Sequence, residues 1–181
     1  VITDLDSAEP TGYHEKAEPV RNKGLISGNY AITKWIIKKN LLDDLFDLSD
    51  DDKVVTKKSV CDYQIRIAYQ IPIKVTHLGA EVEALARTFE DSLIYTNWDV
   101  LSSLKATDPG QLLKKLKDGF EAKKSFDSLK TTIFNELKKS EVKAEFALDL
   151  IFSIAPEEIA VPQYINKGLT WLENVLCTEV N

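Results

Sequence analysis

The chain has 181 residues, of which 44% are apolar, 29% charged and 9% aromatic, the balance of a folded globular protein and not of a disordered one. Its 23 basic and 29 acidic side chains give a net charge of -6, which argues against a duplex nucleic-acid binder that depends on phosphate contacts. The apolar runs are only a few residues long, far short of the ~20 residues of a transmembrane helix, so the sequence predicts a soluble chain.

Residues 1–28 predict an irregular, extended N-terminal arm. They hold three of the seven glycines and two of the six prolines, with no sustained periodicity, which is typical of turns and loops. A short strand is expected near residues 20–27. The remainder, residues 29–181, is expected to form a single α+β domain.

A first helix is predicted from Asn29, a residue type that favours the N-cap, to about Leu48. Its apolar residues recur at steps of three and four: Ile32, Trp35, Ile36, Leu42, Leu45 and Phe46. Acidic side chains, among them Asp50, Asp51 and Asp52, crowd the C-terminal turn and the exit loop, where the helix dipole disfavours negative charge.

The acidic loop has part of the ligand spacing of a calcium-binding loop, at Asp47, Ser49 and Asp51. Asp52 stands where such a loop requires glycine, and Lys58 stands where it requires a bidentate glutamate. We therefore expect a solvated acidic helix end and no metal site.

Apolar and polar side chains alternate from Cys61 to Val75, with the apolar set at odd positions. A second alternation, of opposite parity, runs from Val142 to Ile154. Alternation with period two is typical of a strand with one wet face. We therefore predict a small sheet that contains two long amphipathic strands, at about 61–75 and 142–154.

The length of the first strand sets a physical limit on this prediction. Fifteen residues at ~3.3 Å each would reach ~50 Å, whereas a compact chain of this size has a radius of gyration of ~16 Å. The strand must bend, break or project, and Pro72 predicts a break or an edge position.

Two pairings of the predicted strands are compatible with the charges. An antiparallel pairing sets Arg66 opposite Asp149 and Lys74 opposite Glu141. A parallel pairing that sets Arg66 opposite Glu145 is nearly as good. We slightly favour the antiparallel pairing.

The residues between the two predicted strands, and those after the second, indicate helices. Capping signals predict helix starts at Thr76, Thr96, Asp108 and Ser125, and a last helix runs through residues 164–176. Each helix has one apolar stripe, so we expect an α+β fold in which five to six helices pack as a layer against the dry face of the sheet.

Few residues suit catalysis or metal binding. His14 lies in the arm and His77 follows the first predicted strand, and neither H-E-x-x-H nor C-x-x-C occurs. His77 beside Glu81 and Glu83 resembles a general base, but a partly exposed turn residue is the expectation. Glycine-rich phosphate loops and G-x-S-x-G are missing. We expect no enzymatic activity, no cofactor and no metal.

Cys61 and Cys177 are the only cysteines and form a candidate disulfide. A bridge between them would close a loop of more than one hundred residues, worth ~4–5 kcal/mol in the loop-entropy model. The alternative is two buried free thiols that act as small hydrophobes. Val1 is not an initiator Met, so a processed secreted chain and a cytoplasmic chain are equally compatible with the sequence.

The charge is unevenly distributed. Residues 105–143 hold ten lysines against six acidic residues, a balance of +4 in a chain of net charge -6. The candidate partner surface consists of Lys114, Lys115, Lys117, Lys123 and Lys124, together with Asp50, Asp51 and Asp52. The lysines suit an acidic partner, the acidic end of another copy, or an anionic membrane surface, and the alternative is a solvated helix face.

These features favour a non-enzymatic protein-interaction or assembly module that binds a protein partner or itself. An arm without its own core becomes ordered on a partner, and a long strand edge accepts another strand. Two alternatives stay open. One is a secreted, membrane-active protein of toxin or defence type whose strands rearrange on lipid, and the other is a carrier of an apolar ligand held between sheet and helices.

Overall fold

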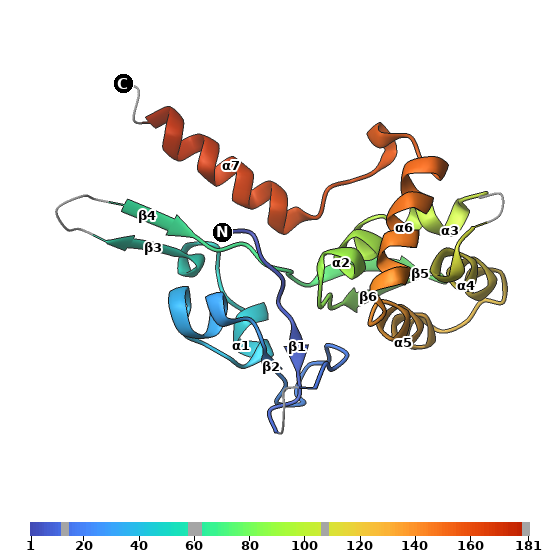
Figure 1. The fold of residues 1–181 in the computed structure, drawn as a ribbon, viewed down its shortest axis with the longest axis horizontal. Coiled ribbons are helices and arrows are strands. Elements are labelled where there is room, and N and C mark those ends of the chain that lie inside the picture. The colour runs from blue at the N-terminus through green and yellow to red at the C-terminus, as the bar shows by residue number, and fades with distance from the viewer. Residues whose placement is uncertain (12–14, 58–62, 106–108, 179–181) are drawn as a thin grey trace. The chain divides into compact units, whose positions relative to one another are not determined.

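The structure, a computed structural model, describes residues 1–11, 15–57, 63–105 and 109–178. These residues form a mixed fold, half helical, with three two-stranded antiparallel sheets (Figure 1), which confirms the α+β class. The chain divides into two compact units. Unit 1 comprises Val1–Pro72, Leu85–Thr88 and Pro162–Asn181, and unit 2 comprises Ile73–Ala84 and Phe89–Val161.

Unit 1 contains two of the small sheets. Strand β1 (Ser7–Ala8) pairs with β2 (Ile26–Ser27), and β3 (Val54–Lys57) pairs with β4 (Tyr63–Arg66), so that Val54 lies opposite Arg66. Its helices are a π-helical segment η1 (Ala31–Ile36), α1 (Leu42–Phe46), a 3-10 turn η2 (Asp51–Lys53) and α7 (Gln163–Thr178).

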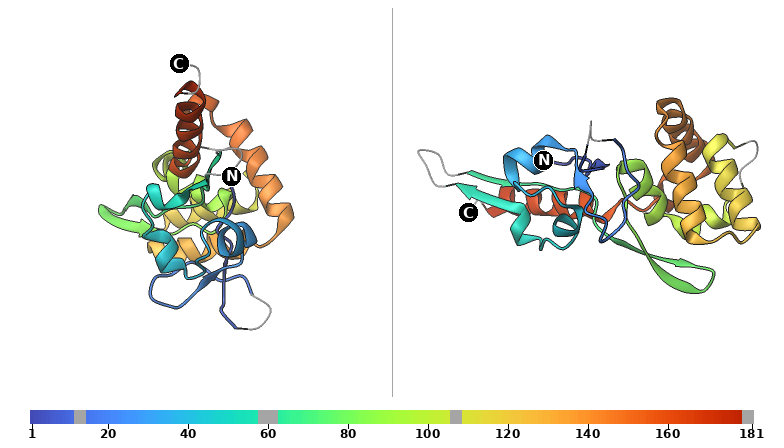
Figure 2. Two further views of the ribbon diagram at one scale, coloured as in Figure 1. Left: turned by 90° about the vertical axis from the view of Figure 1, so that its left-hand side faces the viewer. Right: turned by 90° about the horizontal axis from the view of Figure 1, so that it is seen from below.

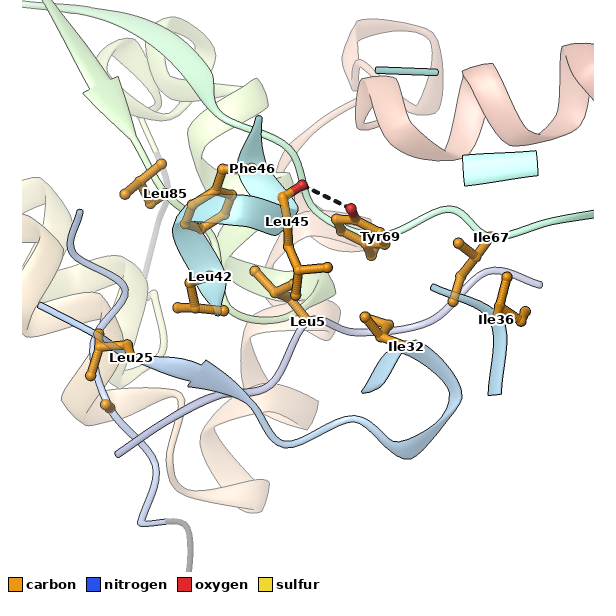
Figure 3. Packing of buried hydrophobic residues seen from close by; sticks show 11 residues of the cluster. Leu5, Leu25, Ile32, Ile36, Leu42, Leu45, Phe46, Ile67, Tyr69 and Leu85 are labelled. Atoms are coloured by element: carbon orange, nitrogen blue, oxygen red, sulfur yellow. Dashed lines mark hydrogen bonds between the residues drawn. The ribbon is translucent and has the colours of Figure 1, made fainter. Parts of the chain in front are cut away.

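The core of unit 1 is assembled from segments that are far apart in the sequence (Figure 3). Its fully buried members include Leu5, Ile32, Leu42, Leu45, Ile67 and Tyr69. The Tyr69 hydroxyl donates to the Leu45 carbonyl oxygen at 2.8 Å, which satisfies a buried polar group in this apolar setting. Residues 1–28, expected as an arm, supply Leu5, Ala17 and Leu25 to this core, as well as β1 and β2.

The predicted continuous helix from Asn29 to Leu48 is wrong, because η1 and α1 are separate. Its start is one residue from the predicted one, because Tyr30 is the N-cap of η1, and the Asn29 carboxamide oxygen accepts from the Ala31 N–H at 2.9 Å just before it. The apolar stripe skips the turn between Ile36 and Leu42, and Lys38 there adopts a positive φ of 59°, which ends a right-handed helix.

Unit 2 begins with a hairpin of β5 (Ile73–His77) and β6 (Ala80–Ala84), which Figure 2 shows as one twisted ribbon. Leu78 and Gly79 form its two-residue turn, both with positive φ, as a type I′ turn requires. The helices are α2 (Phe89–Thr96), α3 (Trp98–Ser103), α4 (Gln111–Glu121), α5 (Phe126–Glu136), α6 (Ser140–Ser153) and the 3-10 turn η3 (Pro156–Glu158).

An aromatic cluster lies at the centre of unit 2. Helices α2 and α3 contact β5, and α4 packs against α3, α5 and α6. Trp98 is 3% exposed, and its ring lies edge-on to His77, Phe120 and Phe126, with centroid distances of 5.6, 5.0 and 5.3 Å. Perpendicular rings at such distances are the favoured geometry of aromatic pairs.

The predicted strand at 142–154 is wrong, because these residues form helix α6. Val142, Phe146 and Leu150 are buried at intervals of four residues, whereas Leu148 and Phe152, on the same parity, are 53% and 83% exposed. Apolar residues at every second position include a set at every fourth position, which also makes a helical stripe. The alternation therefore fits both periods.

The predicted strand at 61–75 is broken into two. Cys61 and Asp62 lie outside the described residues, β4 ends at Arg66, and β5 begins directly after Pro72. The expected break at Pro72 is confirmed. Both predicted pairings between the two long strands are wrong, because β4 and β5 each pair with a neighbour in the sequence, and Lys74 lies opposite Glu83.

Four of the predicted helices are present and one is wrong. Helices α5 and α7 lie where the periodicity places them, and the Ser125 hydroxyl oxygen accepts from the Ser128 N–H at 3.3 Å as the cap of α5. Helix α3 is also present, but its predicted cap is wrong, because Thr96 is the last residue of α2 and Asn97 is the N-cap of α3. Helix α4 is present, but its predicted start at Asp108 is wrong, because Gly110 is the N-cap and the helix begins at Gln111; Asp108 itself lies outside the described residues. The helix expected from Thr76 is wrong, because Thr76 belongs to β5 and the helix starts at Phe89.

Candidate interaction surface

The predicted lysines lie together on one helix and its exit turn. Lys114, Lys115 and Lys117 belong to α4, whose buried residues include Leu112, Leu113 and Leu116; Lys114 lies opposite this stripe, and Lys115 and Lys117 flank it. Lys123 and Lys124 are exposed in the turn between α4 and α5. Lys114 and Lys115 are exposed and Lys117 is half-buried, as expected for polar residues beside an apolar stripe.

One of these lysines is part of an internal ion cluster. The Lys115 ammonium donates to Glu136 Oε1 at 2.7 Å, and Lys139 donates to Glu136 Oε2 at 3.3 Å. The Glu136 side chain is 9% exposed, so the cluster ties α4 to the end of α5. The hydrogen bond from Lys115 holds the pKa of the Glu136 carboxyl below its usual range, and Lys139 acts in the same direction.

Stability should therefore depend on the charge of Glu136. A carboxyl whose pKa is lowered by folding stabilises the fold above its unfolded pKa, and this contribution is lost as the pH falls through the folded pKa. We expect Glu136→Gln to lower the free energy of unfolding by about 1 kcal/mol at pH 7, with a smaller difference in acid. Urea unfolding over a pH series measures this, with Glu121→Gln, at an exposed position, as the control. A pH-independent difference would contradict the assignment.

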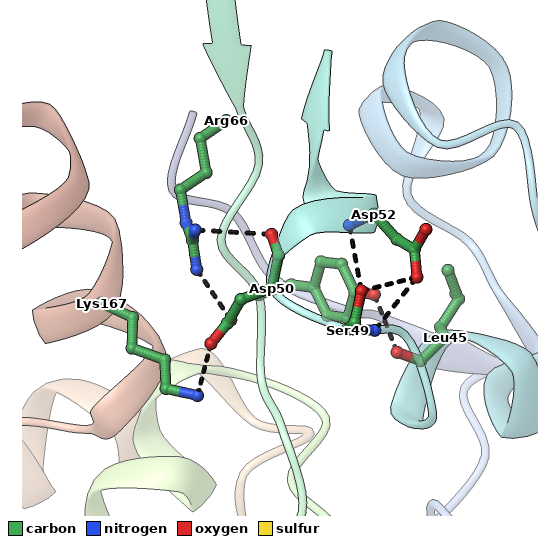
Figure 4. Close-up of polar contacts among 7 residues, drawn as sticks. Leu45, Ser49, Asp50, Asp52, Arg66 and Lys167 are labelled. Atoms are coloured by element: carbon green, nitrogen blue, oxygen red, sulfur yellow. Dashed lines mark hydrogen bonds and ion pairs between the residues drawn. The ribbon is translucent and has the colours of Figure 1, made fainter. Parts of the chain in front are cut away.

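The acidic residues of the predicted surface have different surroundings (Figure 4). Asp50 Oδ1 accepts from Arg66 Nη2 and Asp50 Oδ2 accepts from Lys167 Nζ, both at 2.8 Å. These bonds, that from Lys167 first, lower the pKa of the Asp50 carboxyl. Asp50 therefore joins β4 to α7 within unit 1 rather than presenting a free charge to a partner.

Asp52 is held by a local turn. Its Oδ2 accepts from the Ser49 hydroxyl at 2.7 Å, and the Ser49 hydroxyl oxygen accepts from the Asp52 N–H at 3.2 Å. The bonds from Ser49 lower the pKa of the Asp52 carboxyl. Asp51 is exposed. Within the ranges that the structure describes, no group of three or more His, Cys, Asp and Glu residues is placed to hold a metal ion.

The remaining predicted residues are the histidines and cysteines. His77 is 8% exposed, and its Nε2 lies 2.8 Å from the Lys124 carbonyl oxygen, so the expectation of a partly exposed turn residue is wrong. His14 and Cys61 lie outside the described residues. Cys177 is exposed on α7, which contradicts the buried-thiol alternative at that position, and its pairing with Cys61 stays a prediction because Cys61 is not described.

Helix α7 has an exposed apolar face where the sequence predicts a buried stripe. Leu169, Leu172 and Leu176 are 51%, 46% and 57% exposed. With Ile165 they follow steps of four, three and four residues, which places all four on one face of the helix. We call these four residues the leucine face of α7. Sequence periodicity locates such a face but does not tell whether anything covers it.

The N-terminal half of α7 is anchored to the rest of unit 1. Tyr164 is 4% exposed and its hydroxyl lies 3.2 Å from Gln70 Nε2, and Lys167 pairs with Asp50. A Cβ at Gly168 would lie 3.1 Å from the Ala68 Cβ, so glycine allows this close approach. Beside it, a groove of about 90 Å³ is lined by residues that include Ile2, Ala68, Leu169, Trp171 and Leu172.

Helix α6 of unit 2 combines a capping function with a second exposed apolar group. Asp149 accepts from the Gly110 N–H with both carboxylate oxygens at 3.1 Å, and Glu145 Oε2 accepts from the Gln111 N–H at 2.8 Å. These carboxylates satisfy backbone donors at the N-terminus of α4, where the dipole favours negative charge. Leu148, Ile151 and Phe152 of the same helix are at least half exposed.

Unit 2 also contains a polar cavity of about 260 Å³. Its walls include Lys74 and Thr76 of β5, Asn97 between α2 and α3, Asp99 of α3, and Glu158 of η3. Asn97 holds this region together, since it donates to the Ala160 carbonyl and accepts from the Ala160 N–H, at 2.9 and 2.7 Å. The lining does not suit an apolar ligand.

Comparisons of the chain with protein-family models, with curated proteins and with solved structures found no match. In the described part of the chain, no helix combines the length and the apolarity that crossing a membrane requires.

Proposed function

We propose that the protein is a non-enzymatic assembly module that associates with a second copy of itself through the leucine face of α7. The observation that carries this proposal is the exposure of Leu169, Leu172 and Leu176 on consecutive turns of a helix anchored through Tyr164 and Lys167. Single exposed leucines are ordinary on protein surfaces, whereas a continuous apolar stripe is typical of an interaction site.

The spacing of the leucine face suits another helix. Steps of four, three and four residues are those of the a and d positions of a coiled-coil seam. In an antiparallel pairing with two-fold symmetry, Leu169 of one copy meets Leu172 of the other, and Ile165 meets Leu176. Such a face is complementary to itself, as a symmetric dimer interface requires.

The expected association is weak and concentration-dependent. The seam covers about three helical turns, which is short for a coiled coil, and its leucines are already half covered within the monomer. Complete burial of a leucine is worth ~1.5–3 kcal/mol, so each leucine of the face contributes less than that. The groove beside Ile2 and Trp171 extends the apolar surface available to the second copy.

Light scattering and sedimentation equilibrium over a concentration series test the proposal. We expect the wild type to dimerise with increasing concentration and Leu172→Glu to stay monomeric, because the variant places a charge in the middle of the seam. Thr170→Glu is the matched control, since it adds the same charge at an exposed site about 100° around the helix from Leu169. Circular dichroism should show that both variants are folded.

Two results would contradict this function. A wild type that stays monomeric at the highest concentration would exclude self-association. Association that high salt abolishes and that Leu172→Glu leaves intact would instead assign the contact to charged groups, such as the lysines of α4 and the acidic residues after α1. Association through the leucine face should persist in high salt, because salt does not screen apolar burial.

A further inference from the structure

Three cationic side chains from three separate elements of unit 1 line one small cavity. They are Lys53 of η2, Arg66 of β4 and Lys167 of α7. Lys53 and Arg66 are 5% and 9% exposed. Among the described residues, Asp50 is the carboxylate at ion-pair distance from this group, and it pairs with Arg66 and Lys167.

Lys53 lacks an anionic partner in this arrangement. Its ammonium lies 4.9 Å from the centroid of the Tyr69 ring, and within the described ranges no carboxylate forms an ion pair with it. Burial lowers the pKa of Lys53, and the positive charges of Lys167 and Arg66 lower it further, against the opposite effect of Asp50. Among the described residues, the site therefore holds more positive than negative charge.

Arg66 adds an unused donor to the same site. Its Nη2 is bonded to the Asp50 carboxylate, whereas its Nε is buried and, in the part of the chain that the structure describes, has no hydrogen-bond partner. Buried polar groups are nearly always hydrogen-bonded. Lys53 and Arg66 line the same cavity, so an unsatisfied guanidinium nitrogen and an ammonium without an ion pair among the described residues together indicate a missing acceptor.

The cavity between these groups has room for one oxygen atom. Its volume is about 10 Å³, which is close to the smallest space that holds one water-sized atom. Three cations and one carboxylate leave a local balance of +2 when Lys53 is charged. A buried charge is costly unless it is paired, and a dianion with a projecting oxygen would match both the charge and the space.

We propose that this cavity is a binding site for a phosphate group, one oxygen of which enters between Lys53 and Arg66. The other oxygens stay at the mouth of the cavity, on the side of Lys167, because the cavity is too small for the whole group. Hydrogen bonds from charged donors to an oxyanion are the strong class of such bonds. Lys53 and Arg66 lie outside α7, so the site does not depend on the self-association proposed above.

Thermal unfolding with inorganic phosphate, compared with sodium chloride at the same ionic strength and pH, tests this site. We expect phosphate at about ten times its dissociation constant to raise the unfolding midpoint of the wild type by ~3–5 °C. Lys53→Met should abolish this rise and should itself raise the midpoint without phosphate, because it removes an unpaired buried charge. Lys23→Met, at an exposed lysine of unit 1, should respond to phosphate as the wild type does.

Phosphorus NMR of the titrated wild type provides a second readout that does not depend on a variant. A response to inorganic phosphate alone indicates a free anion as the ligand, and an equal response to phosphoserine indicates a phosphate monoester. An equal midpoint shift with acetate would overturn the assignment to phosphate. A shift that Lys53→Met retains, or no shift relative to chloride, would overturn the site itself.

Discussion

Replacing Trp98 with alanine is expected to lower the free energy of unfolding of unit 2 by about 3–5 kcal/mol. Trp98 is 3% exposed and contacts His77, Phe120 and Phe126, which come from β5, α4 and the start of α5. The substitution removes the side chain that these elements share, and they cannot all move inward to fill the space.

Urea unfolding followed by circular dichroism measures the change, with hydrogen exchange to locate it. The matched control is Trp35→Ala, because Trp35 is 55% exposed and its loss should change the stability by less than about 0.5 kcal/mol. Amides of α4 and α5 should lose protection in Trp98→Ala. Equal effects of the two substitutions would show that Trp98 is not the centre of a packed core.

A comparable loss, of about 2.7–5 kcal/mol, is expected for Leu45→Ala in unit 1. Leu45 is fully buried beside Leu5, Ile32 and Tyr69. The backbone carbonyl that accepts the Tyr69 hydroxyl is retained in the variant. The decrease in the free energy of unfolding therefore comes from the removed apolar side chain and the cavity it leaves, not from the hydrogen bond.

Leu41→Ala is the control for Leu45→Ala. Leu41 directly precedes α1 and is 42% exposed, so the same chemical change there should cost no more than about 1 kcal/mol. Chemical unfolding of both variants, followed by circular dichroism, gives the comparison. If Leu41→Ala were as damaging as Leu45→Ala, the packing of this core would have to be reassigned.

The two proposals concern the same unit but different physical interactions. Self-association depends on apolar area at the exposed end of α7, and phosphate binding depends on charge at Lys53 and Arg66. Lys167 is the residue common to both regions, since it anchors α7 through Asp50 and lines the cavity.

In the segment at 142–154, the spacing of apolar residues does not distinguish a helix from a strand. Its residues satisfy a period of two and an interval of four equally well. Composition distinguishes a helix from a strand better, because β-branched residues favour strands. Between Val142 and Ser153 only Val142 and Ile151 are β-branched, whereas residues 61–75 contain four isoleucines and a valine. Contacts with α4 further favour the helix, because Glu145 and Asp149 accept hydrogen bonds from N–H groups at the N-terminus of α4.

The sequence by itself determined the α+β class, helices α3, α5 and α7, the serine cap of α5 and the break at Pro72, because each depends on neighbours within a few residues. Tertiary structure alone decided which strands pair, that residues 1–28 contribute to a core, and which apolar stripes stay uncovered. The physical reason is that burial is a relation between distant segments. Leu45 and Leu172 are both leucines of amphipathic helices. Leu45 is part of the core and Leu172 is exposed, and this difference comes from the packing of other segments around each helix.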